Sequence, residues 1–286
     1  MSRYIRCTVF AKLSLMLGMA LALSSACAQT FQQIDVPGSI NTAVFGINTA
    51  GDVVGTYTDK NNLGHGFLLT GGIYSYIDFP GASYTAATGI NDSGQVVGYY
   101  TVNNGPPHGF VLTSGAFTAI DHPRASATQV LGINNLGQIV GLFVPTGYKI
   151  SLGFQSAKGK FRTIQPKVST GQASGINNLG LIVGFSKQSP TVTDGFEFGL
   201  GTYTNIVFPG ADWTISWGVN DSGQIVGYEQ TGQFAIEGFE FQQGNFTTYT
   251  FPGALRTLCL GINAGGNIVG YYQTVTLVPH GFILIP

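Results

Sequence analysis

The chain has 286 residues, of which 44% are hydrophobic and only 9% are charged, and its mean hydropathy is +0.22. Charged residues make up about 25% of ordinary soluble domains, so this composition indicates a packed globular protein and excludes a disordered one. The 42 glycines indicate many tight turns and exclude a long helical protein. The formal charge of −1 gives no support to electrostatic binding of nucleic acid.

Residues 1–28 have the pattern of an export signal. Three basic residues, Arg3, Arg6 and Lys12, precede an apolar run over 13–23, and small residues flank position 27. We expect cleavage after Ala28, which leaves nine basic and thirteen acidic residues and a net charge of −4. Lipid attachment at Cys27 is the alternative, although a bulky aliphatic residue is missing before it. The predicted mature chain, 29–286, is therefore secreted, extracellular or periplasmic.

Only one cysteine remains in the predicted mature chain. Cys259 lies in an apolar stretch and has no partner for an internal disulfide. We therefore predict a small buried hydrophobic residue rather than a nucleophile.

A Gly-Ile/Val-Asn triplet recurs through the rest of the chain. Its glycines are 43 residues apart, at Gly46, Gly89, Gly132, Gly175, Gly218 and Gly261. Six copies of 43 residues account for the whole of 29–286, so a second domain is not expected.

Each copy predicts four short strands. In the second copy they lie around 74–79, 85–91, 95–100 and 109–113, and an Asn-x-x-Gly turn joins the second to the third. Four antiparallel strands in about 43 residues are the size of one β-propeller blade, so the sequence predicts an all-β, six-bladed β-propeller. The first-strand run at 31–36 would then complete the last blade beside 281–285 and close the ring. A solenoid of stacked sheets is the structural alternative.

The repeat resembles a known family. His-Gly-Phe occurs at 65–67, 108–110 and 280–282, together with a Gly-Ile-Asn-x-x-Gly-x-Ile-Val-Gly run. These motifs resemble the bacterial extracellular repeat proteins named for a His-Ala-Phe (HAF) motif, although glycine replaces the central alanine here. The resemblance implies secretion and a repeat fold, and it brings no activity and no functional residues.

Strand alternation assigns the connections to two faces. The short regular turns share one face, and the Pro-Gly-Ala segments and the variable loops share the other. Variable side chains on a repeated scaffold are typical of a binding surface. The candidate ligand-binding residues on this face are Tyr84, Asp212, Trp213 and Arg256. Aromatic rings and an arginine suit sugars or a polar partner, and the alternative is that Tyr84 and Trp213 merely pack between blades.

One recurring position carries residue types that bind metals. Around the ring it reads His65, His108, Leu152, Asp194, Glu237 and His280. Five of these are metal-ligand types, which makes a metal site a hypothesis. Equivalent positions on different blades should lie far apart, so a structural role for each residue is the alternative.

Other chemical signals are sparse. No nucleophile, metalloprotease or phosphate-loop motif is present, and we expect no cofactor. Asp92 and Asp221 lie in the Asn-x-x-Gly turns and lack the acidic cluster of a calcium loop. A basic cluster at Lys149, Lys158, Lys160, Arg162 and Lys167 predicts a positive patch, either solvated or used for docking.

These observations favour a monomeric, non-catalytic propeller that binds an extracellular carbohydrate or protein through the variable-loop face. The alternative is an extracellular hydrolase or lyase acting on polysaccharide, with carboxylates such as Asp194 or Asp212 near the central channel. A structural envelope component is a third hypothesis. Fold alone does not separate them, because propellers serve all three roles.

Overall fold

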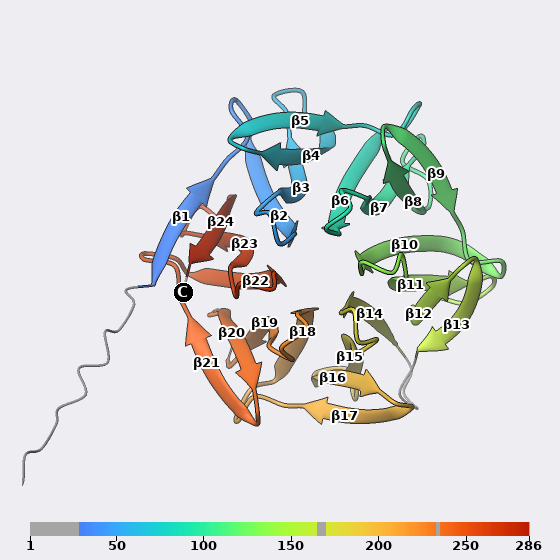
Figure 1. Cartoon of the computed structure of the whole chain (residues 1–286). Helices are drawn as coiled ribbons and strands as arrows, with labels where there is room; N and C mark the ends of the chain where they lie inside the picture. The colour runs from blue at the N-terminus through green and yellow to red at the C-terminus, as the bar shows by residue number, and fades with distance from the viewer. Residues whose placement is uncertain (1–28, 165–169, 233–234, 286) are drawn as a thin grey trace, which may run out of the picture.

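The computed structural model describes residues 29–164, 170–232 and 235–285. The predicted export signal and Lys167 lie outside these residues. Over the described ranges the chain forms 24 β strands and no helix, so these ranges hold no helix that could cross a membrane. The strands are arranged in a ring around a central axis (Figure 1).

Four classes of strand succeed one another outward from the axis (Figure 1). The innermost are β2 (Asn41–Ile47), β6 (Tyr84–Ile90), β10 (Ala125–Ile133), β14 (Gly171–Ile176), β18 (Trp213–Val219) and β22 (Arg256–Ile262). The next are β3 (Val53–Thr58), β7 (Val96–Thr101), β11 (Ile139–Pro145), β15 (Ile182–Lys187), β19 (Ile225–Gln230) and β23 (Ile268–Gln273). The third are β4 (Gly64–Thr70), β8 (His108–Thr113), β12 (Leu152–Ala157), β16 (Thr193–Gly199), β20 (Glu237–Gln242) and β24 (Pro279–Ile285). The outermost are β5 (Ile73–Ile77), β9 (Ala116–Ile120), β13 (Lys160–Ile164), β17 (Thr202–Ile206), β21 (Asn245–Tyr249) and β1 (Thr30–Ile34).

Neighbouring strands in each set of four pair antiparallel, as in β6-β7-β8-β9. The set β22-β23-β24 takes its outermost strand from the start of the chain, because β1 pairs with β24 from Thr30↔Ile285 to Ile34↔Gly281. The expected pairing of the first and last strands is therefore present. Single parallel contacts, Gly64↔Tyr84 and Thr193↔Trp213, link some adjacent sets into eight-stranded sheets.

The strands of the second copy agree with their predicted positions to within two residues. The innermost strand holds the small residues Thr85, Ala86 and Ala87, as expected for a crowded strand beside the axis. Glycine in the neighbouring strand permits close packing. A Cβ atom on Gly98 would lie 1.9 Å from the carbonyl oxygen of Ala86 and 2.8 Å from the ring of Phe110, so no side chain fits there.

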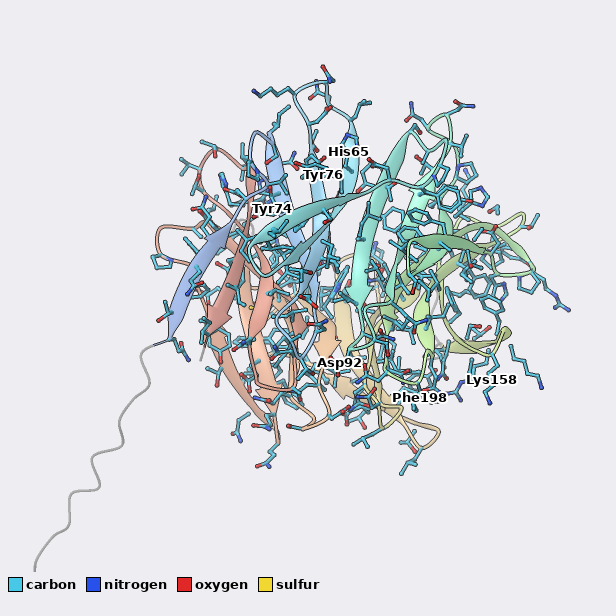
Figure 2. The ribbon with its side chains drawn as sticks, turned by 45° about the horizontal axis from the view of Figure 1, so that its top comes forward. His65, Tyr74, Tyr76, Asp92, Lys158 and Phe198 are labelled. Atoms are coloured by element: carbon cyan, nitrogen blue, oxygen red, sulfur yellow. The ribbon has the colours of Figure 1, made fainter. Side chains whose placement is uncertain are left out.

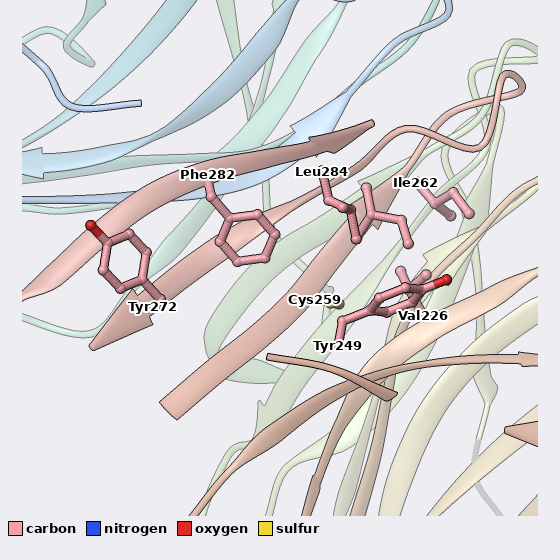
Figure 3. Close-up of a cluster of buried hydrophobic side chains, with 8 residues drawn as sticks. Val226, Tyr249, Cys259, Ile262, Tyr272, Phe282 and Leu284 are labelled. Carbon is pink, nitrogen blue, oxygen red and sulfur yellow. The ribbon is translucent and has the colours of Figure 1, made fainter. Parts of the chain in front are cut away.

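The hydrophobic core lies between successive sheets. Its largest members are the phenylalanines of the third strands, each of which is at most about 1% exposed to solvent: Phe67, Phe110, Phe154, Phe196, Phe239 and Phe282. Figure 3 shows one cluster, in which Cys259 packs with Val226, Tyr249 and Phe282. Burial raises the pKa of the Cys259 thiol, which therefore stays protonated. The prediction that Cys259 is a buried hydrophobic residue is confirmed.

Candidate functional site

The ring has two faces that carry different connections. The hairpin turns at 91–95 and 114–115 lie on one face, which we call the turn face, and the segments at 78–83 and 102–107 lie on the other, the loop face. Figure 2 shows His65 on one side of the ring and Asp92 and Lys158 on the opposite side. Antiparallel pairing within each set requires this division, as the alternation of strands predicted.

The turn face is joined by asparagine side chains. The Oδ1 atom of Asn91 accepts hydrogen bonds from the backbone N–H of Ser93 and Gln95, while its Nδ2 donates to the carbonyl oxygen of Asn134, at 3.1 Å. The same Nδ2-to-carbonyl bond runs from Asn134 to Asn177, from Asn177 to Asn220, from Asn220 to Asn263, and from Asn263 to Asn48. These side chains are buried, so the turns hold neighbouring sets of strands together as well as closing hairpins.

The residues that follow five of the six asparagines, from Thr49 to Asp221, take part in a second series of bonds. Asp92 accepts from the backbone N–H of Thr49 at 2.8 Å and from Nδ2 of Asn135 at 2.6 Å, and Asp221 accepts likewise from Asn178. Burial alone would raise the pKa of Asp92, but the hydrogen bonds from Thr49 and Asn135 outweigh it and lower that pKa. Both aspartates therefore serve as acceptors between neighbouring turns.

The central channel offers little room for a substrate. A cavity of about 200 Å³ opens at the turn face among the asparagines, and the space behind it is about 70 Å³. The rings of Phe45 and Trp217 approach across it, with centroids 6.4 Å apart. Among the described residues that line these two spaces, the carboxylates are Asp92 and Asp221. Asp194 and Asp212 line neither, so the structure does not place them beside the channel.

The loop face carries three histidine–aspartate pairs. Nδ1 of His65 lies 2.8 Å from Asp78, Nδ1 of His108 lies 3.0 Å from Asp121, and Nδ1 of His280 lies 2.9 Å from Asp35. A tyrosine on the adjacent strand stacks on each imidazole: Tyr57, Tyr100 and Tyr272. In each pair the aspartate follows the outermost strand of the same four-strand set.

One of these pairs lines a pocket. A space of about 350 Å³ lies between the start of β4 and the segment 78–83, and we call it the Tyr84 pocket. It is lined by Leu63, Gly64, His65, Asp78, Phe79, Pro80, Gly81, Ala82, Ser83, Tyr84 and Thr85. The ring of Tyr84 lies against Gly64, where a Cβ atom would come within 2.3 Å of Cδ2, so the pocket depends on glycine at that position.

The electrostatic surroundings of this pocket are acidic. Asp59 Oδ2 lies 3.8 Å from Nε2 of His65, and the backbone N–H of Leu63 lowers the pKa of Asp59, so that carboxylate stays ionised. Burial, followed by the charge on Asp78, raises the pKa of Tyr57 to about 12, so its hydroxyl stays neutral. No lysine or arginine is among the described residues that line the pocket.

The candidate ligand-binding residues lie at the edge between neighbouring four-strand sets. Tyr84, Trp213 and Arg256 each form the parallel contact with the preceding set. The indole N–H of Trp213 donates to the carbonyl oxygen of Thr191 at 3.0 Å, while 40% of this residue stays exposed. Nε of Arg256 is buried without a hydrogen-bond partner, and Asp212 is exposed beside Trp213. The alternative that Tyr84 and Trp213 pack between blades therefore explains part of their role. Of the four candidate ligand-binding residues, Tyr84 is the one that lines the Tyr84 pocket.

The five residues of the metal hypothesis are not brought together. His65, His108, Asp194, Glu237 and His280 lie on five different strands of the third class. Each histidine is paired with an aspartate nearby, and no group of three His, Cys, Asp or Glu side chains in the described part of the chain is placed to hold a metal ion.

The equivalent positions on the other half of the ring hold Leu152, Asp194 and Glu237. Glu229 and Glu237 are direct partners across β19 and β20. Burial, with the charge of Glu237 in support, raises the pKa of Glu229 against the hydrogen bond from Thr231. Burial also raises the pKa of Asp194.

The predicted basic cluster is divided between the faces. Lys149 lies in the connection between β11 and β12, on the loop face, whereas Lys158 and Lys160 lie at the hairpin between β12 and β13, on the turn face. Arg162 holds its guanidinium over the ring of Phe198 at 5.3 Å. A single positive patch containing all the described members of the cluster is therefore wrong, because β12 carries the chain from the loop face, where Lys149 lies, to the turn face, where Lys158 lies.

The aspartate partners of the histidines were not singled out from the sequence as site residues. The sequence nevertheless held a signal for these pairs. Asp35, Asp78 and Asp121 each belong to the same four-strand set as a histidine of the motif: His280, His65 and His108, respectively. For two pairs the separation is 13 residues. When two residue types are present together in some copies of a repeat and absent together from the others, contact between them is indicated.

The molecule resembles solved β-propeller structures. No protein-family model matches the sequence, and no curated protein matches it. The propeller domain of the Trilobed protease from Pyrococcus furiosus superposes with a TM-score of 0.50 at 11% identity, covering 85% of this chain and 95% of that one. An Aleuria aurantia lectin variant in complex with Fucalpha1-6GlcNAc gives 0.52 at 12% identity, covering 88% and 93%. TolB from Acinetobacter baumannii gives 0.52 at 10%, covering 86% of this chain and 55% of that one. At these identities the likeness shows the fold alone, and that fold is a β-propeller.

Proposed function

We propose that this chain is a secreted, monomeric, six-bladed β-propeller of 43-residue repeats that binds carbohydrate, without turning it over, in the Tyr84 pocket. The pairing of strands in sets of four and the hydrogen bonds between residues 43 apart support the number of blades and the repeat. The pattern of residues 1–28 supports export, and the resemblance to HAF-repeat proteins agrees with it.

The observation that carries the proposal is the chemistry of the Tyr84 pocket. Its volume of about 350 Å³ lies within the range of about 300–1,000 Å³ that is typical of small-ligand sites. Tyr84 supplies an aromatic surface for the C–H face of a sugar ring, while Asp78 and His65 offer hydrogen bonds to its hydroxyl groups. The hydroxyl of Ser83 donates to the carbonyl oxygen of Thr101 and accepts from the N–H of Asn104, which leaves it one lone pair as a further acceptor. Without a cationic lining residue, the site favours a neutral sugar over a phosphorylated or uronic one.

The lectin similarity supports the same ligand class. The Aleuria aurantia lectin was solved with Fucalpha1-6GlcNAc and with alpha-methyl-L-fucoside. A propeller of this size thus accommodates small sugars in at least one protein, and fucosides belong on the first panel of ligands to test.

The direct test is a glycan array followed by calorimetry with the best ligand. Tyr84→Ala should weaken binding by at least about tenfold, because an aromatic contact and its buried area are lost. Tyr148→Ala is the matched control, since Tyr148 is 65% exposed on the loop face and does not line the Tyr84 pocket. Asp78→Asn should also weaken binding, whereas Asp121→Asn, which alters the equivalent pair in the next blade, should not.

Other outcomes would relocate or remove the site. Loss of binding in Trp213→Ala or Arg256→Ala, with Tyr84→Ala unaffected, would place the ligand at another blade junction. Absence of binding to every glycan on the array would end the carbohydrate proposal and leave an extracellular protein as the partner to seek.

One observation favours the enzymatic alternative, an extracellular hydrolase or lyase acting on polysaccharide. Glu229 and Glu237 face each other across two strands, and the pKa of Glu229 is raised while its neighbour supplies a second carboxylate. An acid of raised pKa beside a second carboxylate is one element of acid–base cleavage of a glycosidic bond. Release of reducing ends from polysaccharide, abolished by Glu229→Gln and retained by Glu197→Gln, would establish it.

A further inference from the structure

Three leucines project from the turn face with almost no cover. Leu136 is 70% exposed, Leu179 is 78% exposed, and Leu200 is fully exposed at the tip of the hairpin between β16 and β17. Leu136 and Leu179 occupy the same position in two consecutive Asn-x-x-Gly turns. Exposed leucines of this kind cost solubility unless another surface covers them.

The three leucines belong to one continuous surface. The turns that carry Leu136 and Leu179 touch, because the backbone N–H of Asn135 donates to Oδ1 of Asn178 at 2.7 Å. The hairpin of Leu200 adjoins the second turn, since a Cβ atom on Gly199 would lie 3.1 Å from Cδ1 of Leu181.

Two lysines border the same surface. Lys158 and Lys160 are exposed at the hairpin between β12 and β13, and Lys158 lines one hollow together with Gly137, the residue after Leu136. The contact between Arg162 and Phe198 joins this strand pair to the one that carries Leu200. We call Leu136, Leu179, Leu200, Lys158 and Lys160 the Leu–Lys patch.

The remaining copies of the repeat lack this combination. The turn position of Leu136 and Leu179 is filled elsewhere by Ala50, Ser93, Ser222 and Gly265, and the hairpin position of Leu200 by Gly71, Ser114, Lys158 and Gln243. The turns of this arc also carry Asn135 and Asn178, whereas the turns on either side carry Asp92 and Asp221. Apolar tips and two lysines thus coincide on an arc whose own Asn-x-x-Gly turns carry no carboxylate, while Asp92 and Asp221 of the flanking turns are held in hydrogen bonds with Asn135 and Asn178.

We propose that the Leu–Lys patch docks the protein on an anionic lipid surface. Leucines on separate turn tips can enter the interfacial layer of a bilayer independently, and the lysines at its border meet lipid phosphates. The positive charge of the patch is complementary to an anionic headgroup layer. Docking through the turn face leaves the Tyr84 pocket open on the opposite side, where Figure 2 shows His65. The inference does not depend on the ligand of that pocket.

The test measures binding to vesicles. The protein is expressed from its whole sequence, and the N-terminus of the purified form is determined by mass spectrometry, because an uncleaved run over 13–23 would bind lipid by itself. Sedimentation with vesicles of phosphatidylglycerol and phosphatidylcholine in equal amounts is compared with sedimentation with phosphatidylcholine alone. We expect binding to the anionic vesicles that weakens as salt is raised.

Each replacement residue in the variants of the Leu–Lys patch is one that this chain already carries at the equivalent position of another copy of the repeat. The triple variant Leu136→Ser, Leu179→Ser, Leu200→Ser should lose at least about tenfold in partitioning to anionic vesicles, because its apolar tips are removed. The variant Lys158→Ser, Lys160→Ala should lose the preference for anionic over neutral vesicles. The matched control Val102→Ser, Val192→Ser, Val275→Ser removes exposed apolar residues from the loop face and should bind like the wild type.

Two results would overturn the proposal. One is a wild-type protein that does not sediment with anionic vesicles, in which case the exposed leucines would point to a protein partner. The other is equal binding by the wild type and the triple serine variant when thermal melting shows both to be folded.

Discussion

The turn face and the loop face are built from the same repeat, yet they use polar side chains differently. On the turn face the asparagines bond to the backbone of the next turn, so one residue type recurs in every copy. On the loop face the histidines bond to an aspartate of their own four-strand set, and only three of the six copies keep that pair. A residue that bonds to the next copy is needed in every copy, so its identity is kept throughout. A pair of residues that bond within one copy can be replaced in the other copies.

The largest effect is expected in the strands that both faces share. Gly98→Ala should cost more than about 4 kcal/mol or prevent folding, because its Cβ would lie 1.9 Å from a backbone oxygen that cannot move aside. Denaturant unfolding measures the loss. Gly265→Ala is the control, since its Cβ would meet Oδ1 of Asn263 at 3.4 Å, an ordinary contact distance, and Ala50 occupies the equivalent turn position. It should stay within about 0.5 kcal/mol of the wild type.

The next largest effect should separate the two faces. Asn134→Ala removes a buried side chain that accepts from Leu136 and Gln138 and donates to Asn177, and we expect a loss of about 2–4 kcal/mol. Asn61→Ala, on the exposed loop after β3, should cost less than about 0.5 kcal/mol. Equal losses in urea unfolding would remove the distinction between the faces.

A smaller effect follows from the second series of bonds on the turn face. The pKa of Asp92 is lowered in the folded state, so its contribution to stability is present above the unfolded value of about 4 and is lost as the pH falls through the folded value. Asp92→Asn should therefore destabilise the protein at pH 7 by about 0.5 kcal/mol, because solvent screens an exposed carboxylate, and by progressively less below about pH 4. A difference that does not change over that range would contradict the role given to the carboxylate.

The smallest effect concerns a histidine outside the three pairs. His122 stacks on Phe143 at 3.7 Å, in the place where Phe79 stacks on Tyr100 and Phe251 on Tyr272. Burial, and then Arg124, lowers the pKa of His122, so stability is full above the unfolded value of about 6.5 and falls as the pH drops through the folded value.

His122→Phe should remove this loss and raise the melting temperature at pH 5 by about 2–4 °C, with little change at pH 8. Melting curves of the variant and the wild type at the two pH values check it. An equal shift in melting temperature at both pH values would mean that the packing of the ring at position 122, rather than the charge of the histidine, causes the change in stability.

Much of the fold could be predicted because its determinants are local. Alternation of apolar residues and the Asn-x-x-Gly turns placed the strands of the second copy to within two residues, and the match between the first and last runs predicted that β1 would pair with β24. The candidate site could be predicted less well from the sequence. Tyr84 was selected for its aromatic ring, but its contact with Gly64 and the presence of Asp78 and Ser83 in the same pocket depend on how two neighbouring blades meet.

The sequence by itself determined the period, the strand order and the side of the ring on which each connection lies, because turn chemistry and side-chain alternation act over a few residues. Only the tertiary structure decided that the turn asparagines bond to the next turn and that His280 meets Asp35 from the opposite end of the chain. It also decided that a pocket forms beside Tyr84 and that three leucines share one exposed surface. The bonds between residues 43 positions apart arise from the lateral packing of whole sheets. The histidine–aspartate contacts, 13 or 245 positions apart, arise from the pairing of two strands within one sheet.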